Sequence, residues 1–111
     1  MSALSPELRE RLDGLVHQAP VVLFMKGTKN FPQCGFSATV VEVLKRAGVA
    51  DFATVNILAD AEVRQGMKDY SNWPTFPQLF VRGELVGGCD IVRDLYESGE
   101  LASILAGGER A

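Results

Sequence analysis

Five consecutive apolar residues, Val21-Val22-Leu23-Phe24-Met25, constrain the fold more than any other feature of the sequence. A strand that is apolar at every position is typical of a strand covered on both faces, because a half-exposed strand carries polar residues at alternate positions. We therefore expect this segment to lie inside a sheet, with helices packed against both of its faces.

Helical periodicity is found on both sides of this strand. The first pattern begins at Ser5-Pro6, an N-cap residue followed by proline at the first helical position, and it ends before Pro20. Two later segments repeat the period, with apolar positions at Phe36, Val40, Leu44 and Ala47 in a helix from Gly35 to Gly48, and at Val63, Met67 and Tyr70 in a helix capped by Asp60.

The remaining apolar segments predict three more strands and a last helix. The strands are expected over Phe52–Leu58, Gln78–Arg82 and Leu85–Gly88, with a hairpin turn at Gly83-Glu84. Asp90 is expected to cap the last helix, which breaks near Gly99 and resumes to about Ala106. A strand–helix–strand unit favours parallel strands and a hairpin is antiparallel, so the order predicts one mixed four-stranded sheet flanked by helices, an α/β arrangement used by the thioredoxin fold.

The composition is that of an ordinary globular chain. With 111 residues, 47% of them hydrophobic, one domain over 1–111 can bury a core without disulfides, leaving a short flexible tail at about 107–111. A net charge of -3 argues against a nucleic-acid partner, and no apolar run approaches the ~20 residues that span a membrane. Residues 1–11 lack a signal-peptide core, so we expect a cytoplasmic protein, with a mature organellar form as the open alternative.

Two cysteines, Cys34 and Cys89, occur without a C-x-x-C motif, which excludes a local zinc ribbon or dithiol pair. Cys34 stands where the polar loop 26–33 meets a predicted helix start. Backbone N–H groups and the positive end of the helix dipole favour a thiolate there, and Lys26 and Lys29 can add positive potential. A thiolate attacks disulfides and ligates metals, whereas the alternative reading of Cys34 is a buried structural thiol.

Ser37 occupies the position where a dithiol enzyme would carry its second cysteine. A serine can cap the first helical turn, but it cannot resolve a mixed disulfide. Cys34 must then exchange with an external thiol, or with Cys89 if the fold brings their Cα atoms within ~7 Å.

Two further segments are candidates for the same site. A cis Phe76-Pro77 bond would present the Phe76 backbone beside Cys34 for pairing with an extended peptide, whereas a plain trans turn would not. Gly87-Gly88-Cys89-Asp90 is either an ordinary turn or an anion site built from backbone N–H groups at a helix start. Arg64, taken alone, is either a solvated surface charge or a ligand contact.

Four segments together resemble the monothiol, CGFS-type glutaredoxins. They are Lys26-Gly27, Cys34-Gly35-Phe36-Ser37, Trp73-Pro74-Thr75-Phe76-Pro77-Gln78 and Gly87-Gly88-Cys89-Asp90. The resemblance runs from about Leu8 to Leu105 and includes the long loop between Lys26 and Cys34. It implies the thioredoxin fold of a single-domain member.

The resemblance implies a groove that binds glutathione beside Cys34, with Lys26 and Arg64 on the glycine carboxylate of the tripeptide. The Phe76 backbone, before Pro77, is implied to pair with the cysteine residue of glutathione. The backbone of Cys89 and Asp90 is implied to bind the γ-glutamyl end, and the Asp90 carboxylate its ammonium group. Thr75 and Trp73 are implied to flank the groove.

The resemblance also implies a [2Fe–2S] cluster, which usually has four thiolate ligands. Cys34 from each of two chains and two glutathiones would supply them, in a homodimer bridged by the cluster. Two exchangeable ligands make such a cluster labile, which suits a carrier. The implied partners are BolA-like proteins and iron–sulfur assembly and acceptor proteins.

Three functions remain open at this point. The chain is a cluster carrier or sensor, a glutathione-dependent protein-thiol oxidoreductase that deglutathionylates through Cys34, or an interaction domain without redox chemistry. The absence of a cysteine at Ser37 and the long loop before Cys34 favour the first.

Overall fold

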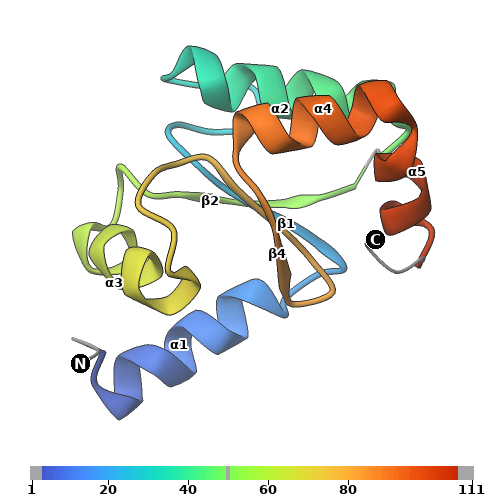
Figure 1. Ribbon diagram of the computed structural model, residues 1–111. Helices are drawn as coiled ribbons and strands as arrows, with labels where there is room; N and C mark the ends of the chain where they lie inside the picture. Colours follow the sequence, from blue (N-terminus) through green and yellow to red (C-terminus); the bar gives the residue numbers. More distant parts are fainter. Residues whose placement is uncertain (1–3, 50, 108–111) are drawn as a thin grey trace.

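The computed structural model describes residues 4–49 and 51–107, which form a mixed four-stranded sheet between two layers of helices (Figure 1). The strands are β1 Val21–Met25, β2 Ala53–Asn56, β3 Gln78–Val81 and β4 Glu84–Gly87. The helices are α1 Pro6–Val16, α2 Gly35–Arg46, α3 Ala61–Ser71, α4 Cys89–Ser98 and α5 Glu100–Leu105. The mixed sheet with flanking helices expected from the sequence is confirmed.

β1 lies inside the sheet, whose strand order is β2-β1-β3-β4. It runs parallel to β2 and antiparallel to β3, and β4 is antiparallel to β3. Leu23 and Met25 pack toward α2, α4 and α5, whereas Val22 and Phe24 pack toward α1 and α3. All five β1 residues are buried, as their unbroken apolar run predicted.

The end of β2 and the position of the hairpin turn differ from those expected from the sequence. β2 stops at Asn56 instead of reaching Leu58, because the Asn56 side chain accepts the Leu58 backbone N–H and turns the chain away from the sheet. The hairpin turns at Arg82-Gly83 instead of Gly83-Glu84. Both turn residues have positive φ, 50° and 81°, as a two-residue type I′ turn requires.

Two predictions about helix positions are wrong. Asp90 does not cap α4, because Gly88 is the N-cap and Asp90 lies in the first turn. Phe36, expected on the buried side of α2, is 63% exposed, and the buried side begins at Ser37. Residues 108–111 of the expected tail lie outside the described residues. None of the helices in the described ranges is long and apolar enough to cross a membrane.

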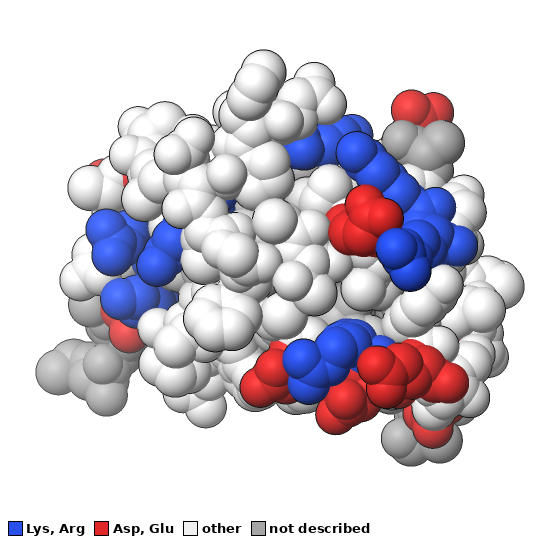
Figure 2. All heavy atoms as spheres, turned by 90° about the horizontal axis from the view of Figure 1, so that it is seen from above, with Lys and Arg blue, Asp and Glu red and all other residues white. Residues whose placement is uncertain are grey.

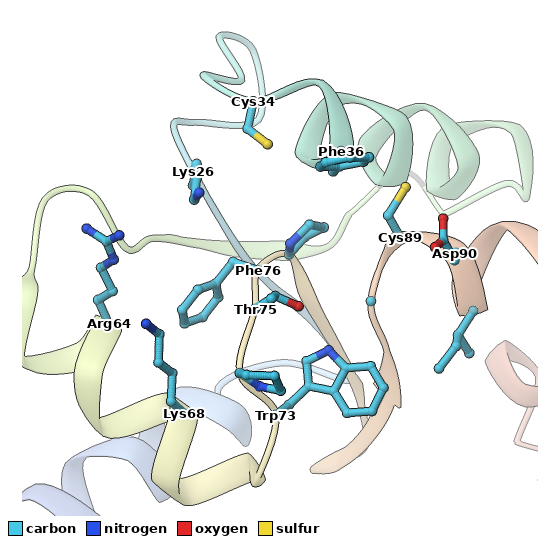
Figure 3. A pocket seen from close by; sticks show the side chains of 14 residues that line it. Lys26, Cys34, Phe36, Arg64, Lys68, Trp73, Thr75, Phe76, Cys89 and Asp90 are labelled. Atoms are coloured by element: carbon cyan, nitrogen blue, oxygen red, sulfur yellow. The ribbon is translucent and has the colours of Figure 1, made fainter.

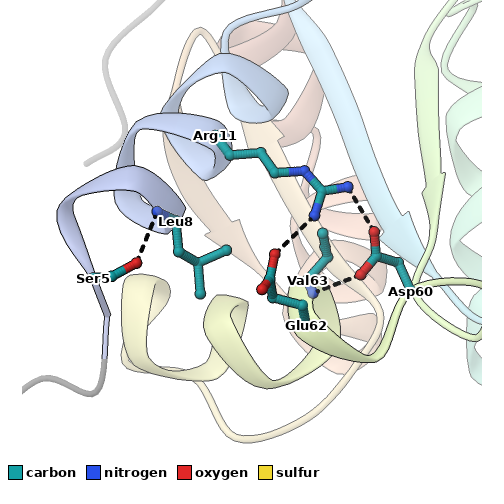
Figure 4. A network of polar contacts seen from close by, with 6 residues as sticks. All are labelled: Ser5, Leu8, Arg11, Asp60, Glu62 and Val63. Carbon is teal, nitrogen blue, oxygen red and sulfur yellow. Dashed lines mark hydrogen bonds and ion pairs between the residues drawn. The ribbon is translucent and has the colours of Figure 1, made fainter.

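Arg11 on α1 is paired with the beginning of α3 (Figure 4). Its guanidinium lies 2.6 Å from Asp60 Oδ2 and 3.2 Å from Glu62 Oε1, while Asp60 Oδ1 caps α3 by accepting the Val63 N–H at 3.1 Å. The hydrogen bond from Arg11 is the main cause that lowers the pKa of Asp60. These contacts attach α3, which carries Arg64, to the layer formed by α1.

We expect the Asp60 carboxylate to stabilise the fold at neutral pH and to lose this effect in acid. A carboxyl group whose pKa is lowered by folding stabilises the protein above its unfolded pKa of about 3.9, and the effect disappears as the pH falls through the folded value. Asp60→Asn keeps a capping oxygen but removes the charge. Urea unfolding should therefore show wild type as the more stable protein at neutral pH and the two as equal in strong acid.

Asp69→Asn, on the exposed side of α3, is the matched control and should change little at either pH. A stability difference for Asp60→Asn that persists in strong acid would contradict the role given to the ion pair.

Candidate functional site

A groove of about 470 Å³ brings together every site residue expected from the sequence (Figure 3). This volume lies within the range of small-molecule sites, roughly 300–1,000 Å³. The expected residues that line the groove are Lys26, Cys34, Arg64, Thr75, Phe76, Pro77, Cys89 and Asp90. The structure establishes that they share one cavity, and their roles toward a ligand remain predictions.

Cys34 is the N-cap residue of α2 and is partly exposed. The backbone N–H of Ser37 is the main cause that lowers its pKa, helped by the Phe36 N–H and the Lys26 ammonium and opposed by partial burial. These are the N–H groups that a helix leaves unpaired in its first turn. The position is that of an accessible, activated thiol, so the reading of Cys34 as a buried structural thiol is wrong.

Two neighbours of Cys34 have roles that differ from the prediction. Ser37 is fully buried, and its Oγ accepts the Lys26 backbone N–H at 3.1 Å instead of capping α2. Lys29 points to Phe52, because its Nζ donates to the Phe52 carbonyl at 2.6 Å and lies 4.2 Å from the centre of the ring. Of the two lysines in this loop, Lys26 is the one whose charge favours the Cys34 thiolate.

The Phe76 backbone forms one wall of the groove. The Phe76-Pro77 bond is cis, one of the two alternatives left open by the sequence. Buried Gln78 donates its Nε2 to the carbonyls of Trp73 and Thr75, both at 3.1 Å, and so holds the loop 73–77 in place. Within the described ranges no hydrogen bond to the Phe76 backbone is found, so its N–H and C=O have no partner in the protein.

The start of α4 forms the opposite wall. A Cβ at Gly88 would lie 3.3 Å from Trp73 Nε1 and 3.4 Å from the Pro77 carbonyl, so this side chain would crowd the loop 73–77. Burial, followed by the charge of Asp90, raises the pKa of Cys89. Both cysteines are free, but their pKa values are shifted in opposite directions, so the thiolate is favoured at Cys34 and disfavoured at Cys89.

The groove contains residues that the sequence analysis did not assign to the site. Lys68 adds a third cation at the Lys26 and Arg64 end, and the spacing of Arg64 and Lys68, one helical turn apart, was the signal that could have identified it. Phe36, Pro74 and Ile91 add apolar lining without such a signal. Viewed from above, one group of Lys and Arg side chains lies at the left edge, on the side of α3, beside a largely uncharged surface, and other groups lie with acidic side chains at the right and lower edges (Figure 2).

Comparison with known proteins identifies the family. The family model described as glutaredoxin matches residues 21–86. The chain is 58% identical over 102 residues to monothiol glutaredoxin-S7, chloroplastic, of Oryza sativa subsp. japonica, covering 92% of this chain and 60% of the relative. This chain belongs to the monothiol glutaredoxins.

Two further comparisons agree with this membership. An uncharacterized monothiol glutaredoxin ycf64-like of Synechocystis sp. is 55% identical over 102 residues, covering 92% of this glutaredoxin chain and 94% of that protein. The solution structure of reduced poplar apo GrxS14 matches with a TM-score of 0.81 and 56% identity, covering 95% of each chain, which confirms the thioredoxin fold. The chain spans 20% to 60% of the length of three plant relatives, monothiol glutaredoxins S11, S7 and S14.

Replacing Lys26 with glutamine should raise the pKa of Cys34 in this glutaredoxin. The Ser37 and Phe36 amides would still stabilise the thiolate, but the ammonium charge would be lost. The pH dependence of Cys34 alkylation by iodoacetamide, followed on the Cys34 peptide by mass spectrometry, reports the midpoint.

Lys29→Gln is the control, because Lys29 lies in the same loop but points to Phe52. Equal midpoints for wild type and Lys26→Gln, or a larger change in Lys29→Gln, would refute the assignment of this charge to Lys26.

Proposed function

We propose that this monothiol glutaredoxin binds glutathione in the groove and, as a pair of copies, carries a labile [2Fe–2S] cluster that it delivers to other proteins. The observation that carries the proposal is the partly exposed Cys34 thiol, with its pKa lowered, at the side of a groove that is cationic at one end. The proposal needs a tripeptide site and a thiolate ligand, and the groove beside Cys34 supplies a candidate for each.

Glutathione has two carboxylates, one ammonium group and one thiol, and the groove offers a candidate partner for both carboxylates and for the ammonium group. Lys26, Arg64 and Lys68 would bind the glycine carboxylate. The open Phe76 backbone would pair with the cysteine residue, as in strand addition. Asp90 and the free N–H groups at the start of α4 would bind the ammonium and carboxylate of the γ-glutamyl end.

Another glutaredoxin supports this ligand at the level of the fold. A buckwheat glutaredoxin was solved as a complex with glutathione, and it matches this chain with a TM-score of 0.78 at 22% identity, covering 94% of this chain and 96% of that one. The fold therefore accommodates glutathione in at least that member.

The donor set of this chain fits a shared cluster better than a closed metal site. Among the described residues, no group of three or more His, Cys, Asp or Glu side chains could hold a metal ion. A [2Fe–2S] cluster usually takes four thiolates, so Cys34 from two copies needs two more, which bound glutathione can supply. BolA-like proteins and iron–sulfur assembly and acceptor proteins are the proposed partners of such a carrier.

A second candidate function uses the same thiol, and the lowered pKa of Cys34 favours it. In that reaction the Cys34 thiolate attacks the glutathione sulfur of a protein mixed disulfide, and the protein thiolate leaves. A second glutathione thiolate then attacks the Cys34–glutathione disulfide, which releases glutathione disulfide and restores the Cys34 thiolate. Rapid turnover by the apo protein in a steady-state glutathione-dependent disulfide reduction assay would favour this function over cluster transfer.

Anaerobic cluster reconstitution tests the carrier proposal. With iron, sulfide and glutathione, wild type should develop the visible absorption of a [2Fe–2S] cluster and elute at twice the monomer mass. Omitting glutathione should leave little cluster, because two of the four ligands would be missing. Cys34→Ser should remain colourless and monomeric, whereas a cluster formed without glutathione, or in a monomer, would contradict the ligand set.

Arg64→Ala should weaken glutathione binding by about tenfold, the loss that follows from removing one charge-assisted hydrogen bond. Titration calorimetry of the apo protein measures the dissociation constant. Arg9→Ala, on the exposed surface of α1, is the matched control and should bind as wild type does. Unchanged binding in Arg64→Ala would remove this residue from the proposed site.

The compartment stays a prediction. Two of the plant relatives are named chloroplastic, so the cytoplasmic location expected from the sequence competes with an organellar one.

A further inference from the structure

Asn56 connects two chain segments that carry different parts of the cationic end of the groove. It is the last residue of β2 and pairs with Met25, the last residue of β1. Its Oδ1 accepts the Gly27 N–H at 2.9 Å and the Leu58 N–H at 3.0 Å. One side-chain oxygen of this half-buried residue thus holds the chain leaving β1 and the chain leaving β2 at the same edge of the sheet.

The bond to Gly27 fixes the peptide that follows Lys26. The carbonyl of this peptide accepts the Gln33 N–H at 2.8 Å, and its N–H is the one that Asn56 binds. Gly27 has a φ of +96°, and a Cβ there would lie 2.6 Å from the Gln33 backbone nitrogen, so the turn is tightly closed. The contact with Asn56 ties this closed turn to the end of β2.

The bond to Leu58 fixes the entry to α3. It closes a turn in which an Asn side chain accepts a backbone N–H two residues on. The chain then reaches Asp60, the N-cap of α3, and Arg64 and Lys68 follow on that helix. Asn56 therefore stands between the turn that carries Lys26 and the helix that carries the other two cations.

We infer that Asn56 is a positioning residue that sets the separation between Lys26 and the α3 cations, so that one ligand carboxylate can meet both. The inference rests on the proposed function, because the carboxylate in question is that of glutathione. Asn56 itself need not touch the ligand, since its oxygen is already used by two backbone N–H groups. Displacing a charged group from its ligand by about an ångström is enough to weaken binding and orientation.

A double-mutant cycle tests this role. Asn56→Leu removes the accepting oxygen at similar volume, and glutathione should bind about fivefold more weakly. In a Lys26→Ala background the same substitution should cause a smaller loss, because one of the two charged groups whose separation Asn56 sets is gone. Binding is followed by the fluorescence of Trp73, the single tryptophan, which lines the groove.

Amide hydrogen exchange supplies a second measurement, in which Asn56→Asp tests whether an oxygen at this position is enough to restore the two hydrogen bonds. Asn56→Asp keeps an oxygen in place, so the Gly27 and Leu58 amides should stay protected, whereas Asn56→Leu should expose both. Asn30→Leu, an exposed position in the same loop as Lys26, is the matched control and should bind glutathione as wild type does. Asn56→Ala replaces Asn56→Leu if the latter does not fold by circular dichroism.

The outcomes separate this inference from the proposed function. Wild type that does not bind glutathione overturns both. Wild-type binding with an unaffected Asn56→Leu variant, or an equal loss with and without Lys26, overturns the positioning role alone and leaves Asn56 as a structural residue.

Discussion

The burial of β1 on both faces is the constraint on which the rest of the structure depends. Its side chains alternate between the layer of α2, α4 and α5 and the layer of α1 and α3, so neither layer has a complete core without it. The strand also ends at the site, because Lys26 follows its last residue and the chain then returns to Cys34 at the start of α2. The element that organises the core therefore also determines where the thiol lies.

The two cysteines show that a helix start is not sufficient to activate a thiol. Cys34 precedes α2 and Cys89 is the first residue of α4, yet the pKa of Cys34 is lowered and that of Cys89 is raised. The backbone N–H groups of Ser37 and Phe36 are causes that lower the pKa of Cys34, whereas burial and the Asp90 charge raise the pKa of Cys89. One groove thus contains one thiol whose surroundings favour the thiolate and one whose surroundings favour the protonated form.

The groove also separates its charges along its length. Lys26, Arg64 and Lys68 lie at one end, while Asp90 and the start of α4 lie at the other. The proposed zwitterionic tripeptide would find complementary groups at both ends of this arrangement, whereas a simple anion would use only the cationic end. The open Phe76 backbone lies between them and suits the extended chain of a peptide.

The sequence by itself determined the order of the elements, the buried central strand and most of the residues that line the groove. Unbroken apolar runs and helical periods are local patterns, so they can be read without knowing what packs against them. It failed at element ends such as Asn56 and Gly88, and at side-chain directions such as those of Phe36, Lys29 and Ser37, because distant contacts decide these. Only the tertiary structure placed Lys68 in the groove and shifted the pKa values of Cys34 and Cys89 in opposite directions. Burial and charge at a site depend on chain segments that only folding brings together.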